Sequence, residues 1–244
     1  TGADLENLLN EAALLAARKD HKSITMEEIE EATIKVVVGT EKKSRVMTNK
    51  EKKLTAYHEA GHAIATYFCD SQDPVHQISI IPRGMAGGFT LMRPQEDLEN
   101  FKSQSEMFEN IVMALGGRMA EKLFLDDIST GASNDIEQAT KLARAMITRY
   151  GMSRDFDMVA METVQNQYLG GDTSLACSAE TQAKIDQQVV ALVKQQHEKA
   201  LKLLTDNRAK LDELAAFLYE KETITGEEFM KILNLEKAQD KTQD

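Results

Sequence analysis

Scarce proline is the feature that most narrows the folds open to this sequence. Only three of the 244 residues are proline and thirteen are glycine. Proline breaks the interior of a helix and glycine weakens it, so long uninterrupted helices are available over most of the chain. Aromatic residues make up 5% and tryptophan is absent, which argues against an all-β sandwich. We therefore expect a mainly α fold.

Apolar residues recur at helical spacing through most of the sequence. The predicted helices cover residues 1–38 as a pair, 50–68, 103–124, 133–150, 178–205, 207–220 and 225–233. Thr25 and Glu28 form a capping-box pattern at the start of the second helix. Two short apolar runs, at 75–81 and 89–92, instead predict one small ribbon of two strands.

Charge and cysteine content exclude several function classes. The chain carries 29 basic and 40 acidic residues, and its net charge of −11 is unfavourable for binding nucleic acid through phosphates. Two cysteines are too few for a disulfide framework. No apolar run is long enough for a membrane helix, and the first residues do not resemble a signal peptide. Because the chain begins at Thr1 without methionine, we expect a fragment of a longer protein.

The sequence HEAGH at positions 58–62 is the motif with the clearest chemistry. On a helix, His58 and His62 lie one turn apart on the same face, where their imidazoles can bind one Zn²⁺. Glu59 lies beside them and can act as general base toward a water molecule without being a ligand. The motif therefore predicts a zinc-dependent peptidase.

Chance also produces this pattern, because only three of its five positions are fixed. The alternative is a helix that merely carries two histidines. Small and apolar neighbours such as Ala60 and Ile64 favour a buried metal helix. Gly61 suggests that another element approaches closely, since glycine otherwise costs about 1 kcal/mol inside a helix.

A zinc site needs a third protein ligand, and neither later histidine lies at a suitable position. His76 lies in a strand-like run and His197 in a long amphipathic helix. The acidic candidates are Glu121, inside a predicted helix, and Asp135, near the start of the next one. Spacing alone leaves both open, and either could be a surface charge.

Four signatures in order make the sequence resemble a known family. They are HEAGH at 58–62, a strand ending in IIPRG at 80–84, GGRMAE at 116–121 and TGASND at 130–135. Together they closely resemble the FtsH family of ATP-dependent, membrane-anchored zinc proteases. The likeness covers almost the whole chain, and the first thirteen residues resemble the final part of that family's AAA lid.

By this resemblance, His58, His62 and Asp135 are the ligands of one zinc ion per chain, and Glu59 is the catalytic glutamate. Glu121 matches an acidic position close to the metal that orients a ligand or the helix without binding the ion itself. The implied fold is a helical metallopeptidase domain with a small β-ribbon, preceded by a short helical AAA-lid remnant. The implied boundaries are 1–40 for the lid, 41–53 for a linker, 54–235 for the peptidase and 236–244 for a polar tail.

The resemblance also implies partners and a location. It implies a homo-hexamer beneath a ring of AAA ATPase domains, which unfold soluble and membrane proteins and thread them to the peptidase. This chain has no G-x-x-x-x-G-K-[ST] loop, so we expect the ATP-requiring domain elsewhere in the same polypeptide and no productive ATP binding here. The implied location of the parent is the cytoplasmic side of the bacterial inner membrane or an organelle inner membrane, with this fragment soluble.

Several alternatives stay open. A catalytically inactive assembly or scaffolding module is the second function hypothesis, although the intact motif residues disfavour it. The strand around Gln77–Ile81 could expose an edge to which an extended substrate adds, or it could merely pack on the metal helix. The segment 166–176 could be a mobile loop that gates the site, or a plain connector.

Overall fold

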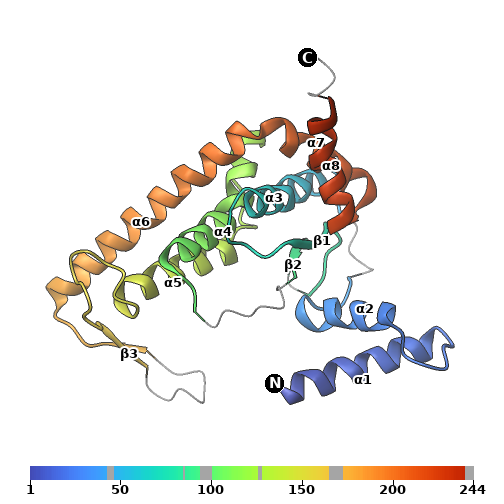
Figure 1. Ribbon diagram of the computed structural model, residues 1–244, viewed down its shortest axis with the longest axis horizontal. Coiled ribbons are helices and arrows are strands. Elements are labelled where there is room, and N and C mark those ends of the chain that lie inside the picture. Colours follow the sequence, from blue (N-terminus) through green and yellow to red (C-terminus); the bar gives the residue numbers. More distant parts are fainter. Residues whose placement is uncertain (43–46, 85, 94–100, 126–127, 165–172, 240–244) are drawn as a thin grey trace.

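Helices dominate the structure, which confirms the expected mainly α fold (Figure 1). The computed structural model describes residues 1–42, 47–84, 86–93, 101–125, 128–164 and 173–239. The helices are α1 (Gly2–Arg18), α2 (Met26–Val37), α3 (Asn49–Tyr67), α4 (Gln104–Leu125), α5 (Ser133–Thr148), α6 (Ala179–Asp206), α7 (Arg208–Lys221) and α8 (Gly226–Gln239). The strands are β1 (Val75–Ser79), β2 (Phe89–Met92), β3 (Glu162–Val164), β4 (Thr173–Leu175) and β5 (Thr223–Thr225). Within the described ranges, every helix is too short or too polar to cross a membrane.

The first two helices form a hairpin that is set apart from the remaining helices (Figure 1). Its own small core contains Ala12, Leu15 and Ala32. Glu28 accepts hydrogen bonds from the backbone N–H and the hydroxyl of Thr25, at the position where the capping box is predicted. The hairpin is therefore stabilised mainly by local contacts.

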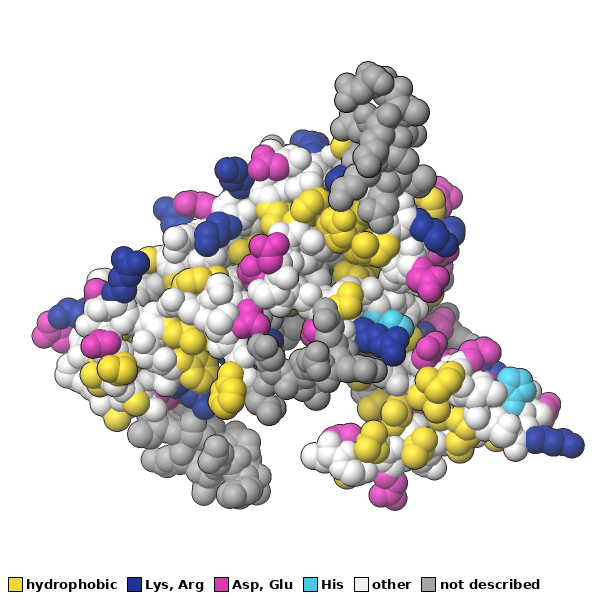
Figure 2. Space-filling model, in the orientation of Figure 1, with side chains coloured by type: hydrophobic (Ala, Val, Ile, Leu, Met, Phe, Trp, Pro, Cys, Tyr) yellow, Lys and Arg dark blue, Asp and Glu magenta, His cyan; other side chains and the backbone are white. Residues whose placement is uncertain are grey.

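Large apolar side chains remain exposed on this hairpin, and Figure 2 shows hydrophobic side chains gathered on its surface. Leu5 is 62% exposed, Met26 65% and Val37 64%. So many exposed apolar side chains on two short helices mark a surface that is suited to contact with another protein element.

The core of the larger part forms where α3 and α4 cross. A Cβ atom added at Gly61 would lie 2.5 Å from the carbonyl oxygen of Gly116, and one added at Gly116 would lie 2.7 Å from the carbonyl oxygen of Gly61. The two backbones therefore touch where both residues lack a side chain. This confirms the expectation that another element approaches Gly61 closely. Helix α6 packs on α4, and α7 packs on α3.

A three-stranded antiparallel sheet lies beside α3, in the order β2-β1-β5. Ile78 of β1 pairs with Thr90 on one side and with Ile224 on the other. Of the two alternatives for this ribbon, β1 itself is not an exposed edge, because β5 occupies the side of β1 that faces away from β2. The edge strand next to α3 is β2, and no further strand pairs with its outer side within the described residues.

Sequence periodicity did not predict three of the five strands. β5 pairs with a strand from the distant N-terminal half, and β3 and β4 form a separate hairpin. The predicted loop at 166–176 is wrong for residues 173–175, which form β4, while residues 165–172 lie outside the described residues. Strands of three residues are too short to show a period of two.

Element boundaries differ from the expected domain boundaries at two places. Helix α3 begins at Asn49, inside the segment expected as linker, where the Thr48 hydroxyl accepts a hydrogen bond from the N–H of Glu51. Helix α8 continues to Gln239, inside the expected tail. The start of the linker segment is also tied to the turn after β1, since Lys42 N–H donates to the carbonyl of Pro82 at 3.0 Å.

Candidate metal centre

The HEAGH residues lie in the middle of α3, on the part of the helix that is covered by other elements. His58, Glu59 and Ala60 are all buried, and His62 is partly buried. The four-residue spacing places both imidazoles on the same side of the helix, where their ring centroids are 4.7 Å apart. The local helix therefore brings two nitrogen ligands together before any tertiary contact is considered.

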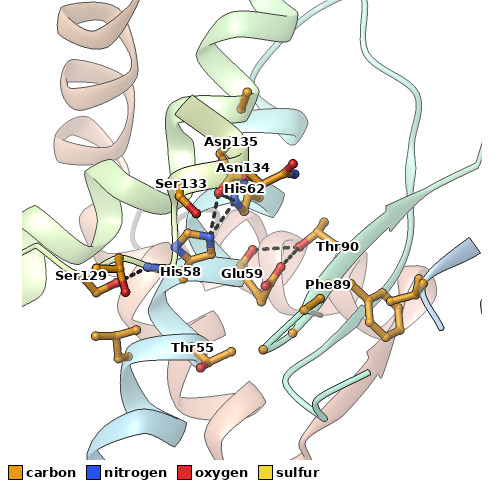
Figure 3. Close-up of a pocket in the computed structure, with 18 of the residues that line it drawn as sticks. Thr55, His58, Glu59, His62, Phe89, Thr90, Ser129, Ser133, Asn134 and Asp135 are labelled. Atoms are coloured by element: carbon orange, nitrogen blue, oxygen red, sulfur yellow. Dashed lines mark hydrogen bonds and ion pairs between the residues drawn. The ribbon is translucent and has the colours of Figure 1, made fainter. Parts of the chain in front are cut away.

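Asp135, in the first turn of α5, supplies a carboxylate to the same point (Figure 3). Its Oδ2 atom lies 3.3 Å from Nε2 of His58 and 3.7 Å from Nε2 of His62. The two Nε2 atoms are 3.1 Å apart. Within the described residues, these three side chains form the one cluster of histidine, cysteine and carboxylate groups that could hold a metal ion.

The spacing of these atoms fits zinc. Ligand atoms about 2.0–2.1 Å from a common tetrahedral centre lie about 3.3 Å from one another, close to the observed separations. A Cβ atom at Gly117 would lie 2.5 Å from Nε2 of His62 and 2.7 Å from Nε2 of His58. The absence of a side chain at Gly117 therefore keeps the space beside the two nitrogen atoms open. Two imidazoles and one carboxylate are also a donor set that zinc prefers.

The Nδ1 atoms of both histidines, on the side of each ring away from the cluster, are hydrogen-bonded to residues of α4. Nδ1 of His58 lies 2.8 Å from Oε1 of Glu121, and Nδ1 of His62 lies 2.9 Å from the carbonyl oxygen of Met113. Both partners can only accept, so each Nδ1 donates and each Nε2 is directed to the cluster. Glu121 is fully buried and also accepts from the N–H and hydroxyl of Ser129, both at 3.0 Å.

Electrostatics at the cluster favour a cation. Burial alone would lower the pKa of His58, but its hydrogen bonds with Asp135 and Glu121 and the charge of Glu59 outweigh burial and raise that pKa to about 10. Burial would raise the pKa of Asp135, yet the two histidines hold it well below its usual range. The carboxylates therefore stabilise positive charge at this point.

Glu59 has a different environment from the three clustered side chains. It is 5% exposed, and burial raises the pKa of its carboxyl, although His62, His58 and a hydrogen bond from Thr90 act in the opposite direction. A carboxylate with a raised pKa is a better proton acceptor near neutral pH. Glu59 and the metal cluster line the same cavity of about 1250 Å³, so a substrate in the cavity could meet both.

The structure places the predicted site residues in two groups. His58, His62 and Asp135 converge, while Glu121 lies outside this cluster and contacts Nδ1 of His58. His76 on β1 and His197 on α6 do not belong to the cluster.

Sequence reasoning did not single out four residues around the site. Thr90 bonds to Glu59, Met113 accepts from His62, Ser129 donates to Glu121, and Gly117 leaves space beside the two Nε2 atoms. Gly117 lies within the GGRMAE signature, which marks this position in the sequence but does not indicate what the glycine does. The other three lie far from the HEAGH motif in sequence, and no local pattern marks them.

Sequence models of two known families match this chain, one over each of its two parts. Residues 45–232 match the sequence model of the family described as Peptidase family M41. Residues 1–31 match the model described as AAA+ lid domain. The first of these matches covers more than half of the chain and includes every residue of the metal cluster.

Individual relatives agree with these matches. An ATP-dependent zinc metalloprotease FtsH of Caldicellulosiruptor bescii is 53% identical over 236 residues, which are 96% of this chain and 38% of the relative. The ATP-dependent zinc metalloprotease FtsH 1 of a Thermoanaerobacter species is 50% identical over 237 residues, which are 96% of this chain and 39% of that protein. A relative from Thermus thermophilus with the same description as the first is 46% identical over 232 residues, 95% of this chain and 37% of its own length. The chain thus spans less than two fifths of the length of each of these three relatives.

Proposed function

Because this chain belongs to peptidase family M41, we propose that it is the zinc-dependent endopeptidase domain of an ATP-dependent protease of the FtsH type. The observation that carries the proposal is the convergence of three ligand atoms beside a buried glutamate, at the wall of one cavity. Two histidines, a carboxylate and a neighbouring base are the groups that metal-assisted peptide hydrolysis needs.

His58, His62 and Asp135 would hold the zinc ion through Nε2, Nε2 and Oδ2. Glu121 and the carbonyl of Met113 would keep the two imidazoles in the ligating orientation. Zinc supplies Lewis acidity, which lowers the pKa of water and polarises a peptide carbonyl. Gly117 would leave room for the ion because it has no side chain.

Glu59 would move the proton. As water attacks the carbonyl carbon of the scissile peptide, an O–H bond breaks and the carboxylate of Glu59 takes the proton while a C–O bond forms. When the C–N bond breaks, Glu59 returns the proton to the leaving nitrogen, so the carboxylate is regenerated. Its burial next to the cluster supports this role, since burial raises the pKa of the carboxyl.

The rest of the chain would have supporting roles. We assign residues 1–40 to the end of an AAA lid, 41–53 to a linker that includes the start of α3, and 54–235 to the peptidase. The exposed apolar side chains of the α1–α2 hairpin support the lid assignment, because they mark a surface for another element.

The parent protein would supply the remaining functions. In this proposal its ATPase ring unfolds soluble and membrane proteins and delivers them to six copies of this domain, on the cytoplasmic side of a bacterial inner membrane. The names of these relatives, which combine ATP dependence with zinc protease activity, support that division of labour.

The proposal is tested by zinc analysis together with cleavage of an unfolded protein such as casein, with and without a chelator. We expect bound zinc, cleavage, and loss of cleavage on chelation. Glu59→Gln should keep zinc and abolish cleavage, because it removes the proton acceptor and leaves all three ligands in place.

Two outcomes would contradict these roles. A Glu59→Gln variant that loses most of its metal would place Glu59 among the ligands. A wild-type chain that binds zinc but cleaves nothing would favour the inactive assembly module instead.

A further inference from the structure

Among the described residues, Thr90 is the one residue of the sheet whose side chain is hydrogen-bonded to Glu59, the proposed general base on α3. It lies on the edge strand β2, opposite Ile78 of β1. Figure 3 shows it directed from the strand toward Glu59. None of the signatures in the sequence includes it.

The Thr90 hydroxyl has two acceptors on Glu59. Its Oγ1 lies 2.9 Å from the carboxylate oxygen Oε2 and 3.2 Å from the backbone carbonyl oxygen. A hydroxyl carries a single proton, so it donates to one acceptor at a time. The carboxylate oxygen is both closer and charged, and a charge-assisted hydrogen bond is the stronger one.

The glycine before β2 leaves room beside the other oxygen of the same carboxylate. A Cβ atom at Gly88 would lie 2.9 Å from Oε1 of Glu59 and 2.7 Å from the carbonyl oxygen of Ser79. A glutamate side chain has three rotatable bonds, and it must lose that freedom before it can act as an oriented base. The hydrogen bond from Thr90 to Oε2 restricts this freedom, while the missing side chain at Gly88 leaves Oε1 accessible.

We propose that Thr90 is a positioning residue whose hydroxyl holds Oε2 of Glu59, so that Oε1 is the oxygen that accepts the proton from water. Oε1 has no hydrogen-bond partner within the described residues, which leaves it available. The inference rests on the proposed peptidase function and adds to it the residue that orients its base.

The test compares Thr90→Val with Thr90→Ser in the full chain loaded with zinc, on a fluorogenic peptide. Valine keeps the β-branched shape and the strand preference but removes the hydroxyl, whereas serine keeps the hydroxyl. We expect Thr90→Val to lower kcat about 10–100-fold, as loss of a supporting hydrogen bond does, with unchanged KM. Thr90→Ser should stay within about threefold of the wild-type kcat, and zinc affinity and Tm should not change in either variant.

A matched control is Thr205→Val, because the Thr205 hydroxyl donates only to a helix carbonyl in α6, that of Leu201. It should leave kcat unchanged. A double-mutant cycle with Glu59→Asp separates positioning from substrate contact, since the shorter aspartate cannot reach the Thr90 hydroxyl in the same way. Thr90→Val should then cost much less in the Glu59→Asp background than in the wild type.

Three results would overturn the proposal: a wild-type kcat for Thr90→Val, a rise in KM alone, or an equal loss in both backgrounds. If Thr90→Val has a lowered Tm, Thr90→Ala replaces it in the same comparison with Thr90→Ser. A wild-type chain that cleaves no peptide would instead remove the proposed function and this inference together, so the two failures are distinguishable.

Discussion

At the scale of single residues, the choice of the third ligand decides what the centre can bind. Asp135 has a short side chain in the first turn of α5, and its Oδ2 lies within 3.7 Å of both Nε2 atoms. Glu121 contacts His58 from the opposite side of the ring. We predict that Asp135→Ala removes most of the zinc affinity, whereas Glu121→Gln lowers it about 10–100-fold.

The zinc affinities of both variants are measured by competition with a chromophoric zinc chelator. Glu137→Gln is the matched control, because Glu137 lies on the same helix as Asp135 but is exposed and forms an ion pair with Lys141. Its zinc affinity should equal that of the wild type. A larger loss from Glu121→Gln than from Asp135→Ala would reverse the two assignments.

At the scale of elements, the crossing of α3 and α4 holds the centre together. Helix α4 carries the carbonyl of Met113 and the carboxylate of Glu121, which contact the histidines of α3, and Gly117, whose missing side chain leaves space beside them. A methyl group at Gly61 would collide with the Gly116 backbone at 2.5 Å and with the Ala120 side chain at 2.6 Å. The two helices would have to separate, and the hydrogen bonds from the Nδ1 atoms of both imidazoles to α4 would lengthen.

We predict that Gly61→Ala lowers both the free energy of unfolding and zinc affinity. Overpacking costs about 1–3 kcal/mol, and the gain in helix propensity of about 1 kcal/mol offsets only part of it. Denaturant unfolding and zinc titration measure the two effects. Gly2→Ala is the control, since nothing lies within 4 Å of a Cβ at Gly2, and it should not destabilise the chain. A Gly61→Ala variant as stable as the wild type would show that the crossing can relax.

At the scale of the whole molecule, the chain carries the groups for hydrolysis but no phosphate-binding loop. We predict no ATP hydrolysis, and cleavage of unfolded proteins while tightly folded ones stay intact. Phosphate release tests the first point. The second is tested with one disulfide-bonded protein before and after reduction and alkylation, so that only its folding differs. Measurable ATPase activity, or equal cleavage of both forms, would contradict this prediction.

Short-range interactions encoded in the sequence account for the helices of the described structure and for part of the metal centre. Each of the eight described helices was predicted, because helical hydrogen bonds, apolar periodicity and caps such as Thr25 with Glu28 act over a few residues. The same short range places His58 and His62 on one face of α3 with Glu59 beside them. Spacing did not select Asp135 over Glu121; the family resemblance and the short side chain of an aspartate near a helix start favoured it.

Contacts between distant segments of the chain could be seen only in the folded molecule. β5 closes one side of β1, and β2 therefore becomes the edge that reaches Glu59 through Thr90. The α3–α4 crossing brings Met113 and Gly117 to the histidines. Such contacts depend on strand pairing and packing between residues far apart in the chain, and neither leaves a periodic signal in the local sequence. The local helix therefore supplies the chemical groups, and long-range packing sets their orientation.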